Sequence, residues 1–165
     1  GGVMTFSLTD IVGYQLKNGP SIKLWSLIPA ALAYLFIIPC EIGTTPFDIA
    51  EAETEICDGP LVEYSGFNLG MYKLTQGIKM YIMASLFIAL FASGIIPAYI
   101  TGSILFDNVL SIAFHILFVI LIVILTISLL RAVTARIRIE QAFKFYWTYP
   151  TILSIISLVL VWAGL

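Results

Sequence analysis

The sequence predicts an all-α membrane protein with about four transmembrane helices. Of its 165 residues, 60% are hydrophobic and only 11% are charged, and the mean hydropathy is +1.03. The apolar residues also form four long runs, and each can cross a hydrocarbon core of about 30 Å as a helix of roughly 20 residues. These observations exclude an ordinary soluble domain. We therefore expect residues 1–165 to form a single multi-pass domain in the cell (plasma) membrane.

The expected elements follow one another along the chain. Residues 3–16 are amphipathic and too polar to span, and Ser7 or Thr9 can cap a short helix there. The four spans are expected near residues 24–40, 74–99, 109–130 and 146–164. Aromatic rings prefer the membrane interface, and the rings near the run ends agree with this assignment: Trp25, Tyr99, Phe145, Tyr146, Trp147 and Trp162.

The basic side chains predict the orientation. Half of the 8 Lys and Arg residues lie in the connector 131–145, which the positive-inside tendency places in the cytoplasm. With four spans, the hairpin at 41–72 then faces the cytoplasm as well. The basic residues of the connector are Arg131, Arg136, Arg138 and Lys144.

The hairpin at 41–72 is acidic in a chain where charge is scarce. Seven of the 10 acidic residues lie in it: Glu41, Asp48, Glu51, Glu53, Glu55, Asp58 and Glu63. Thr45 can cap a helix that starts at Pro46 and stops at Gly59-Pro60. At 100° per residue, Asp48, Glu51 and Glu55 share one face of this short amphipathic helix, while Glu53 points elsewhere.

Two interpretations of these carboxylates stay open. Like charges held close raise at least one pKa, which suits a proton relay. Alternatively, the acids form a solvated face or pair with the arginines of the basic connector, and spacing alone favours this second interpretation. Glu41 ends an apolar helix, so it is either a relay carboxylate or a helix-end group that reaches interfacial water.

The remaining candidates carry weaker signals. His115 lies inside the third run, where an ionisable residue suggests function, yet a neutral packing role is favoured because its own helix has no acidic neighbour. Lys79 is expected to reach the cytoplasmic interface. Cys40 and Cys57 form no Cys-x-x-Cys pair, so we expect reduced thiols and no metal site. A net charge of −2 gives nucleic-acid binding no support.

The motifs of the hairpin resemble a known family. Residues 45–53 (TPFDIAEAE) and 63–66 (EYSG) look like the signature of the ND1/NuoH-type membrane subunit of complex I, which is shared with the membrane subunit of energy-converting, group 4-type NiFe hydrogenases. The resemblance extends to residues 7–15 and 135–141. Family members have about twice as many spans, so the chain resembles their carboxyl-terminal half.

Two details favour the hydrogenase branch. Quinone-reducing relatives typically have Asn-Arg before the TPFD motif, where this chain has Gly43 and Thr44. The run from Asp58 to Val62 before EYSG is also similar to hydrogenase-type subunits. The missing arginine argues against a quinone headgroup site.

The resemblance implies a subunit without a redox centre or other cofactor of its own. Such a subunit docks a hydrophilic redox arm, which holds the NiFe centre and iron–sulfur clusters in its large and small subunits. It also couples ferredoxin-driven electron transfer to proton or sodium translocation by antiporter-like membrane subunits. By position, Glu41, Asp48, Glu51, Glu53 and Glu63 match the family's acidic path, and Arg136 and Arg138 match its docking loop. Alternatives are a quinone-reducing complex I subunit, a sulfur-reducing relative, a stand-alone ion transporter and a passive anchor.

Overall fold

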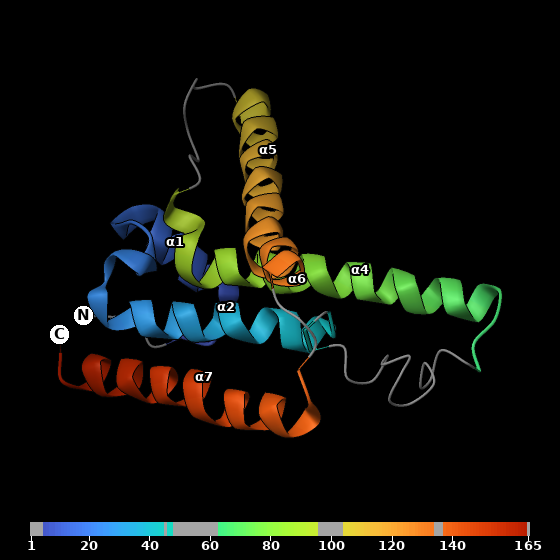
Figure 1. The fold of residues 1–165 in the computed structure, drawn as a ribbon. Helices are drawn as coiled ribbons and strands as arrows, with labels where there is room; N and C mark the ends of the chain where they lie inside the picture. Colours follow the sequence, from blue (N-terminus) through green and yellow to red (C-terminus); the bar gives the residue numbers. More distant parts are fainter. Residues whose placement is uncertain (1–4, 45, 48–62, 96–103, 134–136, 165) are drawn as a thin grey trace.

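The computed structural model describes residues 5–44, 46–47, 63–95, 104–133 and 137–164. All elements in these ranges are helical, which confirms the all-α fold class (Figure 1). Within them, four stretches are long and apolar enough to cross a membrane, as the sequence predicts: Trp25–Ile42, Phe67–Ile95, Leu105–Ala132 and Ile139–Trp162.

The amino-terminal helix α1 (Leu8–Asn18) begins where its cap was expected. The Ser7 side chain accepts a hydrogen bond from the backbone N–H of Asp10, and α1 ends at Gly19 with φ +93°. Two 3₁₀ turns, η1 (Ser21–Lys23) and η2 (Trp25–Leu27), then lead into α2 (Ile28–Ile42). A left-handed Gly43 with φ +73° ends α2, because only glycine adopts this conformation without steric cost.

The later spans contain departures from regular α-helix. Helix α4 (Phe67–Phe87) continues through a π-helical segment η5 (Ile88–Ala92) into a 3₁₀ turn η6 (Ser93–Ile95). Helix α5 (Ile104–Val123) passes through a second π-helical segment η7 (Ile124–Ser128) into the short α6 (Leu129–Val133), and α7 (Ile139–Trp162) is the last helix.

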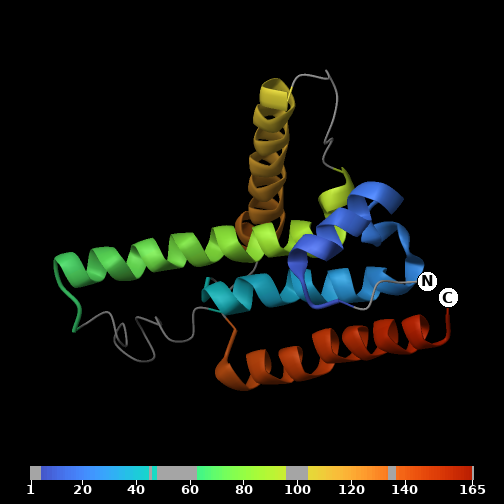
Figure 2. The ribbon, with the colours of Figure 1, turned by 180° about the vertical axis from the view of Figure 1, so that it is seen from behind.

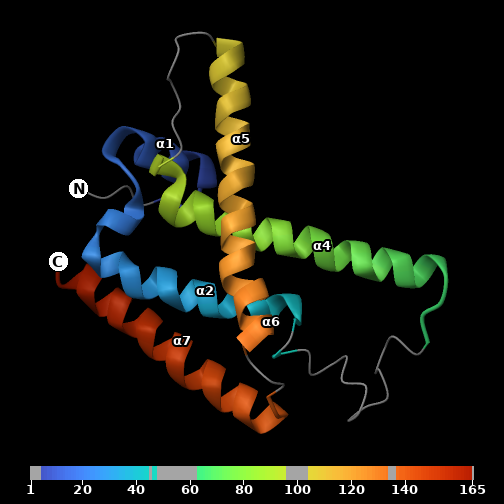
Figure 3. The same ribbon diagram turned by 45° about the horizontal axis from the view of Figure 1, so that its top comes forward.

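Three helices form one layer, and the fourth crosses it. Helix α2 packs against both α4 and α7 and runs in the direction opposite to both, whereas α5 rises steeply from α4 (Figures 1, 2 and 3). The core lies where α2, α4 and α5 meet. It is built around Ile38, Ala84, Phe87 and Ile88, which are all buried.

Three spans begin earlier than expected, and the third span does so by the smallest margin, at Leu105 rather than near 109. Helix α4 starts at Phe67 rather than near 74, and α7 starts at Ile139 rather than near 146. Hydropathy locates the part of a helix that lies in hydrocarbon, whereas the helix itself continues into the interface. The 29-residue stretch Phe67–Ile95 is about 43 Å long at 1.5 Å per residue, which exceeds a hydrocarbon core of about 30 Å.

The loops are correspondingly shorter than expected. The acidic hairpin ends before Phe67 and the basic connector before Ile139. A short surface helix was expected between Pro46 and Gly59. Pro46 and Phe47, at its expected start, form a turn and a bend, and residues 48–59 lie outside the described part of the chain.

Candidate functional site

The candidate site lies where α2 ends and enters the acidic hairpin. The first turns of α4 extend past the end of α2, and α7 begins close to it (Figures 1 and 3). The described residues near this point come from the end of α2, the first residues of the hairpin, α4, the basic connector and α7. We call this region the hairpin root and define it by Glu41, Pro46, Phe47, Lys79, Ile137 and Tyr146.

An ion pair joins α2 to α4 at the hairpin root. The Lys79 Nζ atom lies 3.1 Å from Glu41 Oε1 and also donates a hydrogen bond of 2.9 Å to the Glu41 carbonyl oxygen. Lys79 thus places a cation at the carboxyl end of α2, where the helix dipole is negative. Both side chains are about half exposed, and exposed pairs contribute only about 0–1 kcal/mol. The pair therefore adds little stability and is easily opened.

The first turn of the hairpin is clamped between α2 and α7. Phe47 is buried, with its ring 4.9 Å from the ring of Tyr146 and 5.9 Å from that of Phe145. The Tyr146 hydroxyl in turn donates a 3.0 Å hydrogen bond to the Phe36 carbonyl in α2. These contacts fix Phe47 of the TPFD motif relative to both helices.

The basic connector also touches the hairpin root. The backbone N–H of Ile137 donates a 3.3 Å hydrogen bond to the Pro46 carbonyl. The acidic hairpin and the basic connector therefore lie at the same end of the protein, as the sequence predicts. Arg138 is the N-cap residue of α7, and its backbone N–H donates a 3.3 Å hydrogen bond to Gln141 Oε1.

The structure places only some of the predicted site residues. Glu63 is exposed just before α4, and Arg131 and Arg138 are exposed on either side of the connector. The other predicted site residues lie outside the described residues: Asp48, Glu51, Glu53, Glu55 and Arg136.

Lys79 lies well inside α4 and contacts Glu41. Its side chain is about half exposed, and its reach to the cytoplasmic interface stays a prediction. The sequence could not reveal this pair, because the two residues are 38 positions apart and neither spacing nor motif connects them.

His115 lies away from the hairpin root. Its Nε2 atom is 2.9 Å from the Ser85 hydroxyl of α4, and it lines a cavity beside α1. A hydrogen bond of this kind is what the packing interpretation requires.

Sequence reasoning missed Asp107, which is only 4% exposed in the first turn of α5. An acidic residue at the start of an apolar run was the available signal.

The described residues offer few ligands for a metal. They contain no group of three His, Cys, Asp or Glu side chains that could hold an ion. Cys40 is a free, exposed thiol, and Cys57 lies outside the described residues.

Comparison with known proteins gives consistent matches. The family described as NADH dehydrogenase matches residues 2–162. The NuoH protein of the NADH-quinone oxidoreductase of Brevibacillus brevis is 33% identical over 146 residues, which cover 87% of this chain and 40% of the relative. Its counterpart in Geobacillus kaustophilus is 32% identical over 159 residues, which cover 94% of this chain and 44% of the relative.

A hydrogenase component is also similar. Hydrogenase-4 component C of Escherichia coli is 44% identical over 82 residues, which cover 50% of this chain and 26% of the relative. The chain spans less than half the length of each of these curated relatives.

Proposed function

The chain belongs to the NADH dehydrogenase family of NuoH-type membrane subunits, and on this premise we propose that it anchors and couples a respiratory NiFe hydrogenase-type complex. In this proposal it docks the hydrophilic redox arm and links ferredoxin-driven electron transfer to proton or sodium translocation. The 44% identity to a hydrogenase-4 component over 82 residues supports the hydrogenase branch. The missing Asn-Arg before the TPFD motif supports it as well.

The observation that carries the proposal is the Glu41–Lys79 pair at the hairpin root. Its Nζ–Oε1 distance is 3.1 Å, and both side chains are half exposed. Negative charge that arrives in a docked arm favours protonation of a nearby carboxylate. Protonation of Glu41 removes its attraction for Lys79 and leaves an unneutralised ammonium on α4. Electron transfer would in this way change the charge of a membrane-spanning helix, and antiporter-like neighbours could respond to that change.

Cofactors and partners follow from the same proposal. The NiFe centre and the iron–sulfur clusters belong to the large and small subunits of the arm, and this chain supplies no redox centre. Ferredoxin acts on the arm and reaches this chain only indirectly. A quinone-reducing complex I subunit remains the alternative, because two relatives named as parts of NADH-quinone oxidoreductase match most of the chain.

The coupling role is tested in the purified complex, reconstituted in sealed vesicles. Glu41→Gln keeps the size of the side chain but cannot exchange a proton, and Lys79→Gln removes the cation. We expect both variants to lower ion pumping per hydrogen evolved by about tenfold while assembly is intact. Glu140→Gln is the matched control, because Glu140 is an exposed acid in the first turn of α7. Glu51→Gln makes the same change at a carboxylate within the hairpin. Unchanged pumping in both Glu41→Gln and Glu51→Gln would overturn the coupling role and leave a docking role.

The identity of the complex is tested by its composition and activity. The complex is purified in mild detergent through this chain, its subunits are identified by mass spectrometry, and hydrogen evolution and quinone reduction are assayed. A nickel-containing large subunit with hydrogen evolution is expected. Quinone reduction without nickel would move the chain to the complex I branch.

A further inference from the structure

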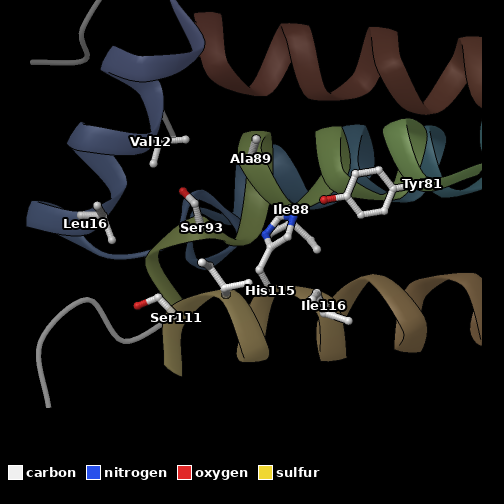
Figure 4. Close-up of a pocket in the computed structure, with 10 residues that line it drawn as sticks. Val12, Leu16, Tyr81, Ile88, Ala89, Ser93, Ser111, His115 and Ile116 are labelled. Carbon is white, nitrogen blue, oxygen red and sulfur yellow. The ribbon is translucent and has the colours of Figure 1, made fainter. Parts of the chain in front are cut away.

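A second site lies beside α1, apart from the hairpin root. A cavity of about 480 Å³ opens between α1, the end of α4 with its π segment, and α5 (Figure 4). This volume falls within the range of roughly 300–1,000 Å³ that is usual for small-ligand pockets. Its walls are mostly apolar and include Val12 and Leu16 of α1 and Ile112 and Ile116 of α5. We call it the α1 cavity.

The polar side chains that line the α1 cavity are three hydroxyl groups and one imidazole. Among the described residues, its lining includes no Lys, Arg, Asp or Glu; the polar lining residues are Tyr81, Ser93, Ser111 and His115. Figure 4 shows the Tyr81 hydroxyl pointing toward the middle of this group. An anionic phosphate would find no fixed cation here. A neutral oxygen, such as an ester carbonyl, matches the hydroxyl donors.

Ser93 supplies the sharpest evidence for a ligand. It is only 6% exposed, and its Oγ atom has no hydrogen-bond partner among the described residues. A helical serine commonly bonds to the carbonyl three or four residues earlier, and for Ser93 these are Leu90 and Ala89. Both carbonyls already accept hydrogen bonds of 2.9 Å from Gln15 Nε2. The Ser93 hydroxyl, on a residue that lines the cavity, thus makes no hydrogen bond to either carbonyl or to any other described residue.

The position of α1 indicates the depth of the cavity in the membrane. Val12 and Leu16 are four residues apart and line the cavity; Leu16 is also exposed, as are the charged residues Asp10 and Lys17. An amphipathic helix of this kind lies in the boundary between headgroups and acyl chains. The ester oxygens of membrane lipids are found at this boundary.

We propose that the α1 cavity binds one diacyl membrane lipid. An acyl chain lies along Ile88, Ile112 and Ile116, and an ester carbonyl accepts a hydrogen bond from the Ser93 hydroxyl. The charged headgroup remains outside, because the described lining carries no charged side chain. This proposal rests on the cavity alone and is independent of the coupling role proposed for the hairpin root.

Photo-crosslinking of the wild-type complex tests the position of the lipid. The probe is phosphatidylethanolamine with a diazirine near the ester end of one acyl chain, and modified residues are mapped by mass spectrometry. We expect modification to concentrate at Ile112 and Ile116 on α5 and at Val12 and Leu16 on α1. An even spread of modification along residues 109–125 would overturn the proposal, because it would indicate only general lipid contact.

Lipid retention tests the cavity with matched variants. Ile116→Trp fills the cavity, while Leu117→Trp adds the same bulk at a neighbouring exposed position that does not line it. After detergent washing, native mass spectrometry should show lipid loss in Ile116→Trp only. Ser93→Ala should weaken lipid binding by about 2- to 12-fold, as expected for one hydrogen bond. Equal retention in both Trp variants, or retention of a quinone instead of a diacyl lipid, would overturn the proposal.

Discussion

At the scale of single residues, Gly94 is required by a close backbone approach. A Cβ atom at this position would lie 2.6 Å from the Gln15 carbonyl oxygen, 2.6 Å from the Pro20 nitrogen and 2.7 Å from the Gly19 carbonyl carbon. All three are backbone atoms, so no side chain can move aside to relieve the clash. Only glycine therefore permits η6 to pack against the end of α1.

Replacing Gly94 with alanine should destabilise the protein. We expect Gly94→Ala to cost about 1–3 kcal/mol, as is usual for overpacking, and to lower the thermal midpoint measured by circular dichroism in detergent. Gly77→Ala is the control, because no atom outside its own helix lies within 4 Å of the added Cβ. Alanine is favoured over glycine within a helix by roughly 0.5–1 kcal/mol. Equal shifts of the midpoint in both variants would contradict this account.

Exchanging the charges of Glu41 and Lys79 should lower ion pumping less than placing two positive charges at these positions. Glu41→Lys alone places two cations together, whereas the double variant Glu41→Lys, Lys79→Glu restores opposite charges between α2 and α4. We expect the double variant to recover part of the ion pumping lost in the single variant, measured in the same sealed vesicles. A double-mutant cycle then gives the coupling between the two positions. If the losses of ion pumping in the two single variants simply add in the double variant, Glu41 and Lys79 act independently.

At the scale of elements, the π segment η5 (Ile88–Ala92) explains how α1 is held. A π-helical turn shifts the backbone hydrogen-bond register, and Gln15 Nε2 donates to the carbonyls of Ala89 and Leu90 within it. Gln15 is completely buried, and its Oε1 accepts from the Ser21 N–H at 3.4 Å. One side chain thus connects α1, η1 and η5.

Removing the Gln15 amide should loosen α1. Gln15→Leu keeps a similar volume but leaves the two carbonyls without these donors, at a cost of about 1–3 kcal/mol. We expect amide hydrogen exchange in α1 to become faster by roughly tenfold or more. Asn18→Ala is the control, since the Asn18 side chain is exposed and its hydrogen bond, to the Tyr14 carbonyl, stays within α1. Unchanged exchange in Gln15→Leu would show that α1 is held by apolar contacts alone.

At the scale of the whole molecule, the opposed directions of α2 and its neighbours α4 and α7 bring both charged loops to one end. The hydrogen bond from Ile137 to the Pro46 carbonyl joins the basic connector to the acidic hairpin at this end. The positive-inside tendency predicts that this end faces the cytoplasm. A docked arm would meet the Glu41–Lys79 pair there, while the α1 cavity lies elsewhere in the molecule.

Cysteine labelling in inside-out and right-side-out vesicles tests this topology. Cys40 and Cys57 are first replaced with serine, and single cysteines are introduced at three exposed positions, Lys17, Glu63 and Arg138. We expect a membrane-impermeant maleimide to label the Glu63→Cys and Arg138→Cys variants from the cytoplasmic side and Lys17→Cys from the opposite side. Labelling of Glu63→Cys and Arg138→Cys from different sides would contradict the arrangement.

The sequence by itself determined the fold class, the four spans and the family, and it offered Ser7 as one of two possible caps of α1. Each of these depends on a local property: apolar length, a capping residue next to the helix, or a contiguous motif such as TPFD or EYSG. The sequence also predicted that the acidic hairpin and the basic connector lie at the same end of the protein. Two spans separate these loops, and loops separated by an even number of spans lie on the same side of a membrane. The helix starts at Phe67 and Ile139 did not follow, since hydropathy marks hydrocarbon depth rather than helix ends.

Only the tertiary structure decided which residues meet. Glu41 pairs with Lys79, His115 with Ser85, and Gln15 with Ala89, at separations of 38, 30 and 74 residues. Helices of a membrane protein are apolar on nearly all sides, because lipid and protein neighbours are both apolar. Their sequences therefore carry little sign of which face turns toward another helix. The Glu41–Lys79 pair and the α1 cavity depend on those faces, so both appear only when the helices are packed.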